Sequence, residues 1–197
     1  MKRFSIFLLL MIGVAGTASC AAASGSLGMH LGFAKARDAE DGNGLLGGQV
    51  ELGDSGFLGI QGSVDYRLVE STEIQSNGVH GKLAVRSVPV TVSARLYPLP
   101  RSGPSPFIVL GAGWYYILYD YSKNLEALGA DDDSEFTFGW HVGGGLSLPL
   151  NSTWSVYGEG RAVFVDPDKK PDQELFDDVS GWDYDSSYWA AGLNLHY

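Results

Sequence analysis

The chain has 197 residues, with 23 acidic and 13 basic side chains and a formal net charge of −10 at pH 7. This balance argues against nucleic acid as a partner, because binding to phosphates requires a basic surface. The 27 glycines argue against a helical protein and favour curved strands and turns.

The first 23 residues have the pattern of a secretory signal peptide. A basic start at Lys2 precedes an apolar run over residues 4–15, which is too short to span a bilayer, and small residues follow as far as Ala23. Cleavage after Ala23 would leave a mature chain without cysteine. Cys20 keeps a second interpretation open, in which the mature chain begins with a lipid-modified cysteine. We therefore expect export by the Sec route, followed by one domain over residues 24–197.

Eight later stretches alternate apolar residues with small or polar ones, which is the pattern of β-strands with two unlike faces. Their approximate bounds are residues 27–33, 45–52, 57–68, 88–96, 107–119, 136–148, 154–164 and 187–197. The sixth stretch is the most regular, since Phe138 and Trp140 alternate with Thr137, Gly139 and His141. Most stretches reach the length of about 9–11 residues that a tilted membrane strand requires.

The fourth stretch is the least regular. Leu83 and Val85 lie before it and are out of phase with its apolar residues. Either a bulge near Arg86 and Ser87 shifts the register, or this part of the chain stands clear of a bilayer. Pro89 lies within the stretch and has no amide hydrogen for the strand ladder, so a local irregularity is expected there.

The connections alternate between short turns and long charged loops. The shorter ones are residues 53–56, 98–106 and 149–153, and the longer ones are residues 35–44, 69–79, 120–135 and 166–186. Outer-membrane barrels have this asymmetry, with both chain ends at the short-turn, periplasmic side. A soluble β-sandwich or a lipocalin-like cup would have the same periodicity with its faces exchanged.

Two further observations favour the membrane. Small residues gather on the polar face of the strands, as a narrow lumen requires, and Trp and Tyr lie near strand ends, as in an interfacial belt. The sequence therefore predicts an all-β fold: an eight-stranded, antiparallel, up-and-down transmembrane β-barrel.

Several segments resemble the small outer-membrane β-barrel superfamily, the OmpA-barrel and OmpX-like group. They are residues 107–113, 143–148, 157–161 and the last strand. In that strand Gly192, Leu195 and Tyr197 match the family's assembly signal, although Ala190 stands where a polar residue is usual. The resemblance implies a monomer in the bacterial outer membrane, surrounded by lipid and lipopolysaccharide and inserted by the barrel-assembly machinery. It defines the architecture more firmly than the activity.

Six charged residues have the inward phase, three of each sign. They are Glu51, Asp65, Arg67, Arg95, Glu159 and Arg161. Buried charges are tolerated only when they are paired, and eight strands leave little free cross-section inside a barrel. The sequence therefore predicts a self-neutralising network that plugs the lumen. The alternative is a narrow gated pore in which these residues set the selectivity.

His30, His141 and His196 also have the inward phase. A zinc site needs at least three ligands at one depth, and His30 and His196 are expected at different depths of neighbouring strands. Hydrogen-bonded lumen histidines are therefore expected, with no metal site and no cofactor.

Enzyme activity is not expected. Lipid A deacylases resemble this chain in size and strand number, but their hydrolytic His and Ser face the lipid. Here His141 has the lumen phase and no serine two residues later, and a nucleophile elbow is absent.

Acidic residues gather in two of the long loops, at 131–133 and between 166 and 185. Clustered carboxylates could hold Ca²⁺ or Mg²⁺ and bridge to lipopolysaccharide phosphates, but the spacing of an EF-hand is absent. Solvated loops that repel one another are the simpler interpretation. Loops on a rigid scaffold are also where an unknown external ligand would bind.

The predicted function is a non-enzymatic structural or surface-exposed outer-membrane protein. A small channel for ions or solutes is the alternative, and a lipid-modifying enzyme comes third.

Overall fold

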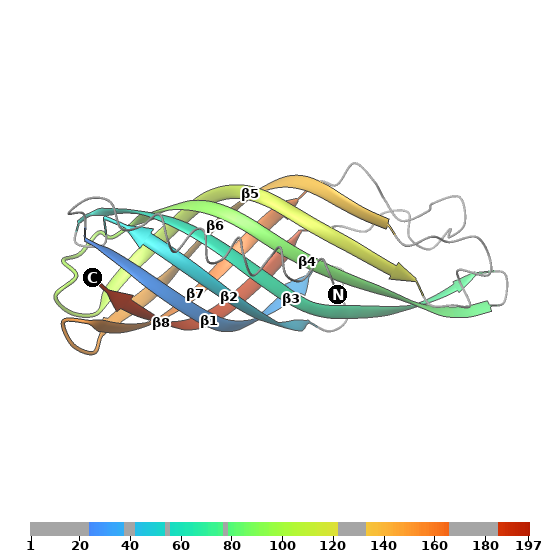
Figure 1. Ribbon diagram of the computed structural model, residues 1–197, viewed down its shortest axis with the longest axis horizontal. Coiled ribbons are helices and arrows are strands. Elements are labelled where there is room, and N and C mark those ends of the chain that lie inside the picture. Colours follow the sequence, from blue (N-terminus) through green and yellow to red (C-terminus); the bar gives the residue numbers. More distant parts are fainter. Residues whose placement is uncertain (1–23, 38–41, 54–55, 77–78, 122–132, 166–184) are drawn as a thin grey trace.

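The structure is a computed structural model, which describes residues 24–37, 42–53, 56–76, 79–121, 133–165 and 185–197. Eight antiparallel strands form one closed barrel, each paired with the next and the last with the first (Figure 1). The strands are β1 (Gly25–Ala36), β2 (Asn43–Leu52), β3 (Leu58–Ser76), β4 (Val79–Leu96), β5 (Ser105–Tyr121), β6 (Asp133–Pro149), β7 (Trp154–Val165) and β8 (Ser186–His196). The predicted fold is confirmed. Within the described residues, no helix is long and apolar enough to cross a membrane.

The first strand begins and the last strand ends at the end of the barrel that carries the short turns, where the C-terminus lies in Figure 1. The Gly25 amide donates to the Tyr197 carbonyl at 3.2 Å, and the Tyr197 amide donates back to the Gly25 carbonyl at 3.0 Å. Two turns are tied to the same end, since the Gly53 amide donates to Ser24 and the His196 amide donates to Thr153. Gly53 has a φ of 77°, which favours glycine in this turn.

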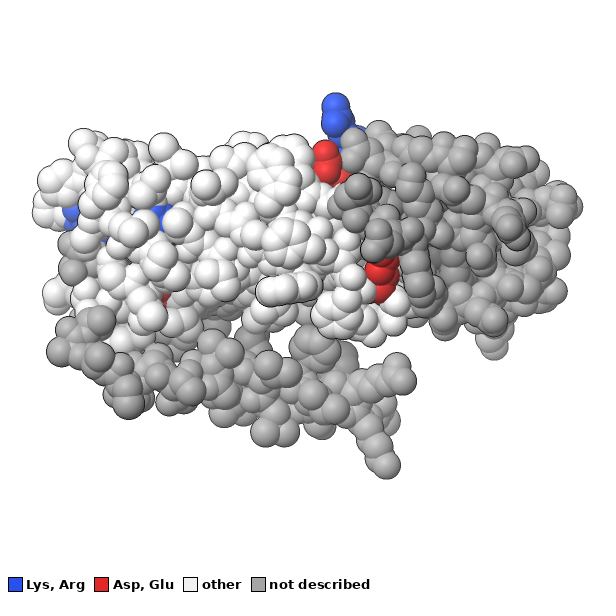
Figure 2. Space-filling model, turned by 90° about the horizontal axis from the view of Figure 1, so that it is seen from above, with Lys and Arg blue, Asp and Glu red and all other residues white. Residues whose placement is uncertain are grey.

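The faces of the strands are exchanged relative to those of a soluble protein. Large apolar side chains are exposed around the barrel, among them Met29, Leu31, Leu110, Phe138, Leu146 and Trp189. Polar and charged side chains fill the inside, among them Gln49, Gln61, Arg95, His141, Glu159 and Asn194. On the face seen in Figure 2, the charged residues gather mainly near the two ends of the described surface. Such a wide apolar band is stable only in contact with another apolar medium.

β3 and β4 are longer than their apolar alternation predicts. The segment 69–79, expected to be a loop, is largely a two-stranded extension, in which the register runs from Glu70↔Val85 to Ser76↔Val79. This extension projects beyond the other strands in Figure 1. Alternation of apolar residues marks only strands with one face against lipid or core, so it could not detect a ribbon in water.

The expected bulge exists, but its extra residue is in β3 rather than in β4. The β3–β4 register shifts between Arg67 and Glu70, opposite Arg86, whereas the β4–β5 register is unbroken. β4 therefore keeps its phase, and Val85 packs inside against the apolar cluster near the loop end. The pairing of β3 with β4 is also interrupted between the pairs Val64↔Val90 and Arg67↔Ser87. Pro89 lies in this interval of β4.

Two apolar clusters lie inside the barrel. The cluster nearer the loops consists of Ala34, Leu45, Tyr115, Ile117, Tyr119, Val163, Tyr188 and Ala190, and the cluster nearer the short turns consists of Tyr97, Phe107, Val109 and Tyr157. The lumen therefore holds bulky aromatic and aliphatic side chains as well as the polar residues that the sequence predicts. The second cluster contacts the ionic groups directly, since Arg95 lies over the rings of Phe107 and Tyr157.

Candidate functional site

The lumen contains a chain of ion pairs centred on Glu159, which projects inward from β7. Its carboxylate accepts from Arg95 Nη2 at 2.5 Å and from Arg161 Nη2 at 2.7 Å. The Tyr188 hydroxyl donates to the same carboxylate at 2.5 Å. All four side chains are almost completely buried. One carboxylate thus holds two guanidinium groups, and it has hydrogen bonds that offset the cost of removing these charges from water.

Arg95 links this carboxylate to a second one, Glu51 on β2. Arg95 Nη1 donates to Glu51 Oε2 at 3.1 Å, while the Tyr97 hydroxyl donates to Glu51 Oε1 at 2.9 Å. Arg95 also lies over the ring of Phe107, 4.5 Å from its centroid. The guanidinium group of Arg95 is therefore held on two sides by carboxylates and on its face by an aromatic ring.

A third cation, Arg101, reaches the network from the turn between β4 and β5. Its Nη2 lies 2.5 Å from Glu51 Oε1, and its side chain remains 17% exposed. Arg101 was not predicted from the sequence, because a proline-rich turn has no strand periodicity that would indicate the direction of a side chain. The network around Glu51 and Glu159 therefore has three guanidinium groups against two carboxylates.

Neutral polar groups continue the network across the barrel. Arg161 Nη2 donates to Gln61 Oε1 at 3.0 Å, and the Gln61 amide donates to Gln49 Oε1. Gln49 in turn donates to Asn194 Oδ1 at 2.9 Å. Four strands, β2, β3, β7 and β8, are thus connected through the lumen by side chains.

Asp65 and Arg67 also face the lumen, but they lie outside the Glu51–Glu159 network. Asp65 Oδ1 lies 2.7 Å from His30 Nε2, and the Tyr157 hydroxyl lies 2.9 Å from His30 Nδ1. A methyl group at Gly47 would overlap the Asp65 carboxylate and the His30 ring, so glycine makes room for this pair. Arg67 instead donates to Ser186 Oγ at 2.9 Å. Of the six charged residues, Glu51, Arg95, Glu159 and Arg161 therefore form one network, whereas Asp65 and Arg67 have other partners.

The other two histidines have separate partners. His141 Nε2 lies 2.8 Å from Ser93 Oγ, and His196 Nε2 lies 2.8 Å from Ser155 Oγ. Within the described part of the chain, no group of three His, Cys, Asp or Glu side chains could hold a metal ion. Ser93 and His141 do not form a triad, because both Ser93 and Arg161 approach Nε2 while Nδ1 has no hydrogen-bond partner among the described residues.

A cavity of about 710 Å³ opens at the short-turn end of the barrel. It is lined by Glu51, Tyr97 and Arg101 toward the network, and by hydroxyl-bearing side chains such as Ser105 and Ser155. The cavity therefore ends at the ionic network. Further into the barrel, Gln61, Arg95 and His141 are among the largest completely buried side chains.

The residues of the expected assembly signal lie on both faces of the last strand. Gly192 pairs with His30 on β1 and with Tyr157 on β7. Leu195 pairs with Leu27 and Trp154, and Tyr197 is 55% exposed at the end of the barrel. This strand closes the sheet between β7 and β1, and a role of these three residues in assembly stays a prediction.

The acidic loop segments 131–132 and 166–184 and the predicted signal peptide lie outside the described residues. Asp185, at the edge of the fourth loop, is described: its Oδ1 accepts from the Val165 amide at 3.3 Å.

Residues 5–197 match the family model for the outer membrane protein beta-barrel domain. No curated protein matches the chain significantly. Among solved structures, the chain is similar to a major outer membrane protein from Thermus thermophilus, with a TM-score of 0.62 and 13% identity over 90% of this chain and 100% of that one. It is also similar to Neisserial surface protein A, with a TM-score of 0.58 and 12% identity over 90% and 98% of the two chains.

A third similar structure is that of Ail from Yersinia pestis, in complex with the heparin analogue sucrose octasulfate. Its TM-score is 0.53, with 15% identity over 89% of this chain and 97% of that one. At these identities the solved structures establish a shared fold and no shared activity.

Proposed function

Because the chain belongs to the outer membrane protein β-barrel family and so resides in the bacterial outer membrane, we propose that it acts there as a non-enzymatic, closed barrel that presents its long loops at the cell surface. The observation that carries this proposal is the ionic network across the lumen. Arg95 joins Glu51 to Glu159 inside the barrel, and all three are at most 4% exposed.

The network supports a plug because opening it would be costly. Moving any one of these side chains aside would leave a partner charge unpaired in an environment poor in water. Eight strands give a lumen that their own side chains fill. The stiff barrel then serves as a scaffold on which the loops are free to vary.

The loop sequences suggest the charge of a partner. Residues 166–185 contain eight acidic and two basic side chains. A polyanion such as the sulfated sugar bound to Ail is therefore not the ligand we propose for these loops. Divalent cations or a basic protein surface fit the charge better.

A small channel remains the second candidate, because the cavity at the short-turn end leads toward the network. Conductance across a planar lipid bilayer separates the two. We expect no discrete stable conductance for the wild-type protein. We expect a measurable one for the double variant Glu51→Ser, Arg95→Ser, which removes one charge of each sign and shortens both side chains. A wild-type conductance that the variant Ser155→Trp abolishes would overturn the plug and favour the channel, since Ser155 lines that cavity.

The non-enzymatic part of the proposal has its own test. Lipid A extracted from cells that express the protein should have the same acyl chains, by mass spectrometry, as lipid A from cells without it. A change in acylation that requires the protein would assign it an activity on lipid.

A further inference from the structure

The cavity at the short-turn end of the barrel has no role in a closed scaffold. Its volume is about 710 Å³, and its wall comes from β2, β6, β7, β8 and the turn between β4 and β5. The residues that line it include Glu51, Arg101, Ser147, Ser155 and Asn194. Because the short turns of outer-membrane barrels lie on the periplasmic side, this cavity opens toward the periplasm.

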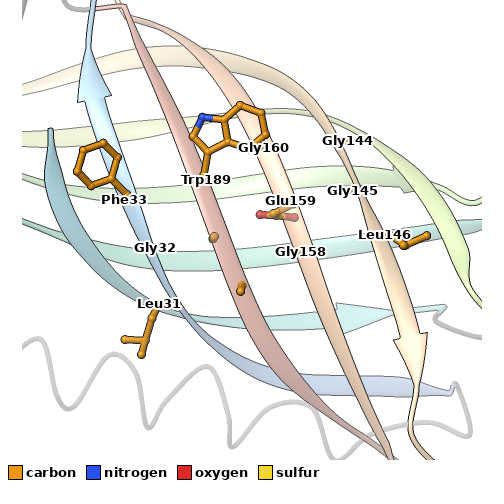
Figure 3. Close-up of a pocket in the computed structure, with 12 residues that line it drawn as sticks. Leu31, Gly32, Phe33, Gly144, Gly145, Leu146, Gly158, Glu159, Gly160 and Trp189 are labelled. Atoms are coloured by element: carbon orange, nitrogen blue, oxygen red, sulfur yellow. The ribbon is translucent and has the colours of Figure 1, made fainter.

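A second hollow, on the outside of the barrel, is of a different kind. It has a volume of about 620 Å³ and crosses β6, β7, β8 and β1 (Figure 3). Its outward residues are glycine, alanine or large apolar side chains such as Leu31, Leu146 and Trp189. These side chains offer no hydrogen bond to a polar ligand, whereas the cavity at the short-turn end is lined largely by polar groups.

The acidic side chain in the described wall of that cavity, Glu51, is already occupied. Its carboxylate accepts from Arg95 Nη1 at 3.1 Å and from Arg101 Nη2 at 2.5 Å. The Tyr97 hydroxyl donates to the same carboxylate at 2.9 Å. Two oxygens thus share three donors, so Glu51 has little acceptor capacity left for a cationic ligand.

Three other side chains of the wall have donors without a partner. Asn194 is 3% exposed, and its Oδ1 accepts from Gln49 Nε2 at 2.9 Å, which leaves its Nδ2 group to donate into the cavity. Arg101 uses Nη2 for Glu51, while its Nη1 has no hydrogen-bond partner among the described residues. The hydroxyl of Ser147, on the inward face of β6, has none among them either. The cavity therefore presents unused donors from three parts of its wall.

Arg101 is held in place for a contact of this kind. Its guanidinium group lies 3.2 Å from the centroid of the Tyr97 ring, and its side chain remains 17% exposed. Tyr97 is itself buried and fixed by its hydrogen bond to Glu51. A guanidinium group that is fixed in advance loses little conformational entropy when it binds an anion.

From these donors we propose that the cavity binds a small organic molecule of the periplasm through a carboxylate group. A carboxylate only accepts hydrogen bonds, and it therefore matches the unused donors of Asn194, Arg101 and Ser147. Phosphate, which carries up to two charges, fits less well because the Glu51 carboxylate lies in the same wall. The inference goes beyond the proposed function and does not depend on whether the lumen is plugged.

Saturation-transfer NMR of the protein in lipid nanodiscs tests this site, with empty nanodiscs as the blank. The probes are N-acetylglycine and its neutral amide, N-acetylglycinamide, which have nearly the same size and differ in one charge. We expect the wild-type protein to bind the acid at least about threefold more tightly than the amide. Arg101→Gln should bind the two equally. Lys35→Gln removes the same charge from the exposed outer surface and should keep the preference for the acid.

A second pair of variants tests whether the cavity is the binding site. Ser155→Trp fills the cavity and should weaken binding of both probes by about fivefold or more. Its control is Ser187→Trp, which places the same ring on the exposed outer face of β8 and should have no effect. Heat-modifiable migration on a gel verifies that each variant is folded, and Ser147→Trp replaces Ser155→Trp if that variant is not.

Several results would overturn the proposal. Equal binding of acid and amide by the wild-type protein would remove the carboxylate site, and a preference that survives Arg101→Gln would place the anion elsewhere. Equal effects of Ser155→Trp and Ser187→Trp would exclude the cavity. Inorganic phosphate that competes at lower concentration than N-acetylglycine would assign a different anion. Conductance is measured without these probes, so a failure of the plug and a failure of this site are distinguishable.

Discussion

At the scale of single residues, the lumen shows how a narrow barrel accommodates charge. Glu159 contacts two guanidinium groups, and Glu51 contacts two, with Arg95 shared between them. Each carboxylate also accepts from a tyrosine hydroxyl, Tyr188 or Tyr97. Removal of a central member therefore leaves charges of one sign together, whereas removal of a peripheral member does not.

Replacement of Glu159 by Gln should destabilise the barrel strongly. Arg161 and Arg95 would then face each other without the carboxylate between them, and breaking a buried pair in this way costs about 3–5 kcal/mol. Urea unfolding in detergent micelles, followed by tryptophan fluorescence, measures the change in the free energy of unfolding. Arg101→Ala is the control: Arg101 is partly exposed and Glu51 keeps Arg95, so the loss should be about 1 kcal/mol or less. Equal losses for the two variants would show that Glu159 is not central.

At the scale of elements, the strands differ in how much of their length belongs to the membrane. β3 has 19 residues and β4 has 18, whereas β2 has 10. Crossing the hydrocarbon takes about 9–11 tilted residues, so the longest strands extend well beyond it. From the pair Glu73↔Lys82 to the pair Ser76↔Val79, β3 and β4 pair only with each other among the described residues.

The extension of β3 and β4 should therefore be dispensable for the barrel. Replacing residues 73–82 by a two-residue Asn-Gly turn would keep the pair Thr72↔Leu83 and close the hairpin tightly. We expect the variant to insert into liposomes and to keep its heat-modifiable migration, with a midpoint of unfolding close to that of the wild type. Loss of a folded barrel would mean that the extension contributes to folding.

The last strand should be sensitive to a much smaller change. Tyr197 exchanges two backbone hydrogen bonds with Gly25 and occupies the final place of the expected assembly signal. Deleting Tyr197 should lower the amount of protein at the cell surface several-fold, whereas Tyr197→Phe, which keeps an aromatic ring, should not. Surface levels are measured by antibody labelling of intact cells, and normal levels after the deletion would contradict the assigned signal.

At the scale of the whole molecule, the barrel has an apolar exterior and a polar interior. This arrangement is stable because lipid surrounds the outer face, while the closed sheet pairs each strand with two neighbours and leaves no open edge in the hydrocarbon. The exterior is also uneven: aromatic pairs such as Trp114–Phe138 and Trp140–Phe164 lie toward the loop end of β5, β6 and β7. Aromatic side chains are stable where hydrocarbon meets headgroups.

Spin labels should report this orientation in liposomes. Labels at Leu110 and Leu146 should be accessible to oxygen and shielded from a water-soluble nickel complex, because both side chains lie in the exposed apolar band. Labels at Ser102 and Ser152, in two of the short turns, should show the opposite accessibility. If Leu110 and Leu146 report water instead, the barrel is not oriented with its apolar face toward lipid.

How far the site could be predicted differs from residue to residue. Glu51, Arg95, Glu159 and Arg161 could be placed inside the barrel from phase alone, because a strand has a strict period of two. Their partners could not be predicted, since phase gives the face of a residue but not its depth or its neighbours across the lumen. For that reason the pairing of Asp65 with His30, rather than with an arginine, could not be predicted.

The amino-acid sequence by itself determined the number of membrane strands, their inward and outward faces and the end at which the short turns lie. These features depend on the local alternation of side chains and on the lengths of the connections, and both are properties of the sequence alone. Only the tertiary structure decided that Arg101 enters the lumen, that the bulge lies in β3, and that Asp65 pairs with His30. Those outcomes depend on the stagger of strands around a closed sheet, a collective property that brings together residues far apart in the chain.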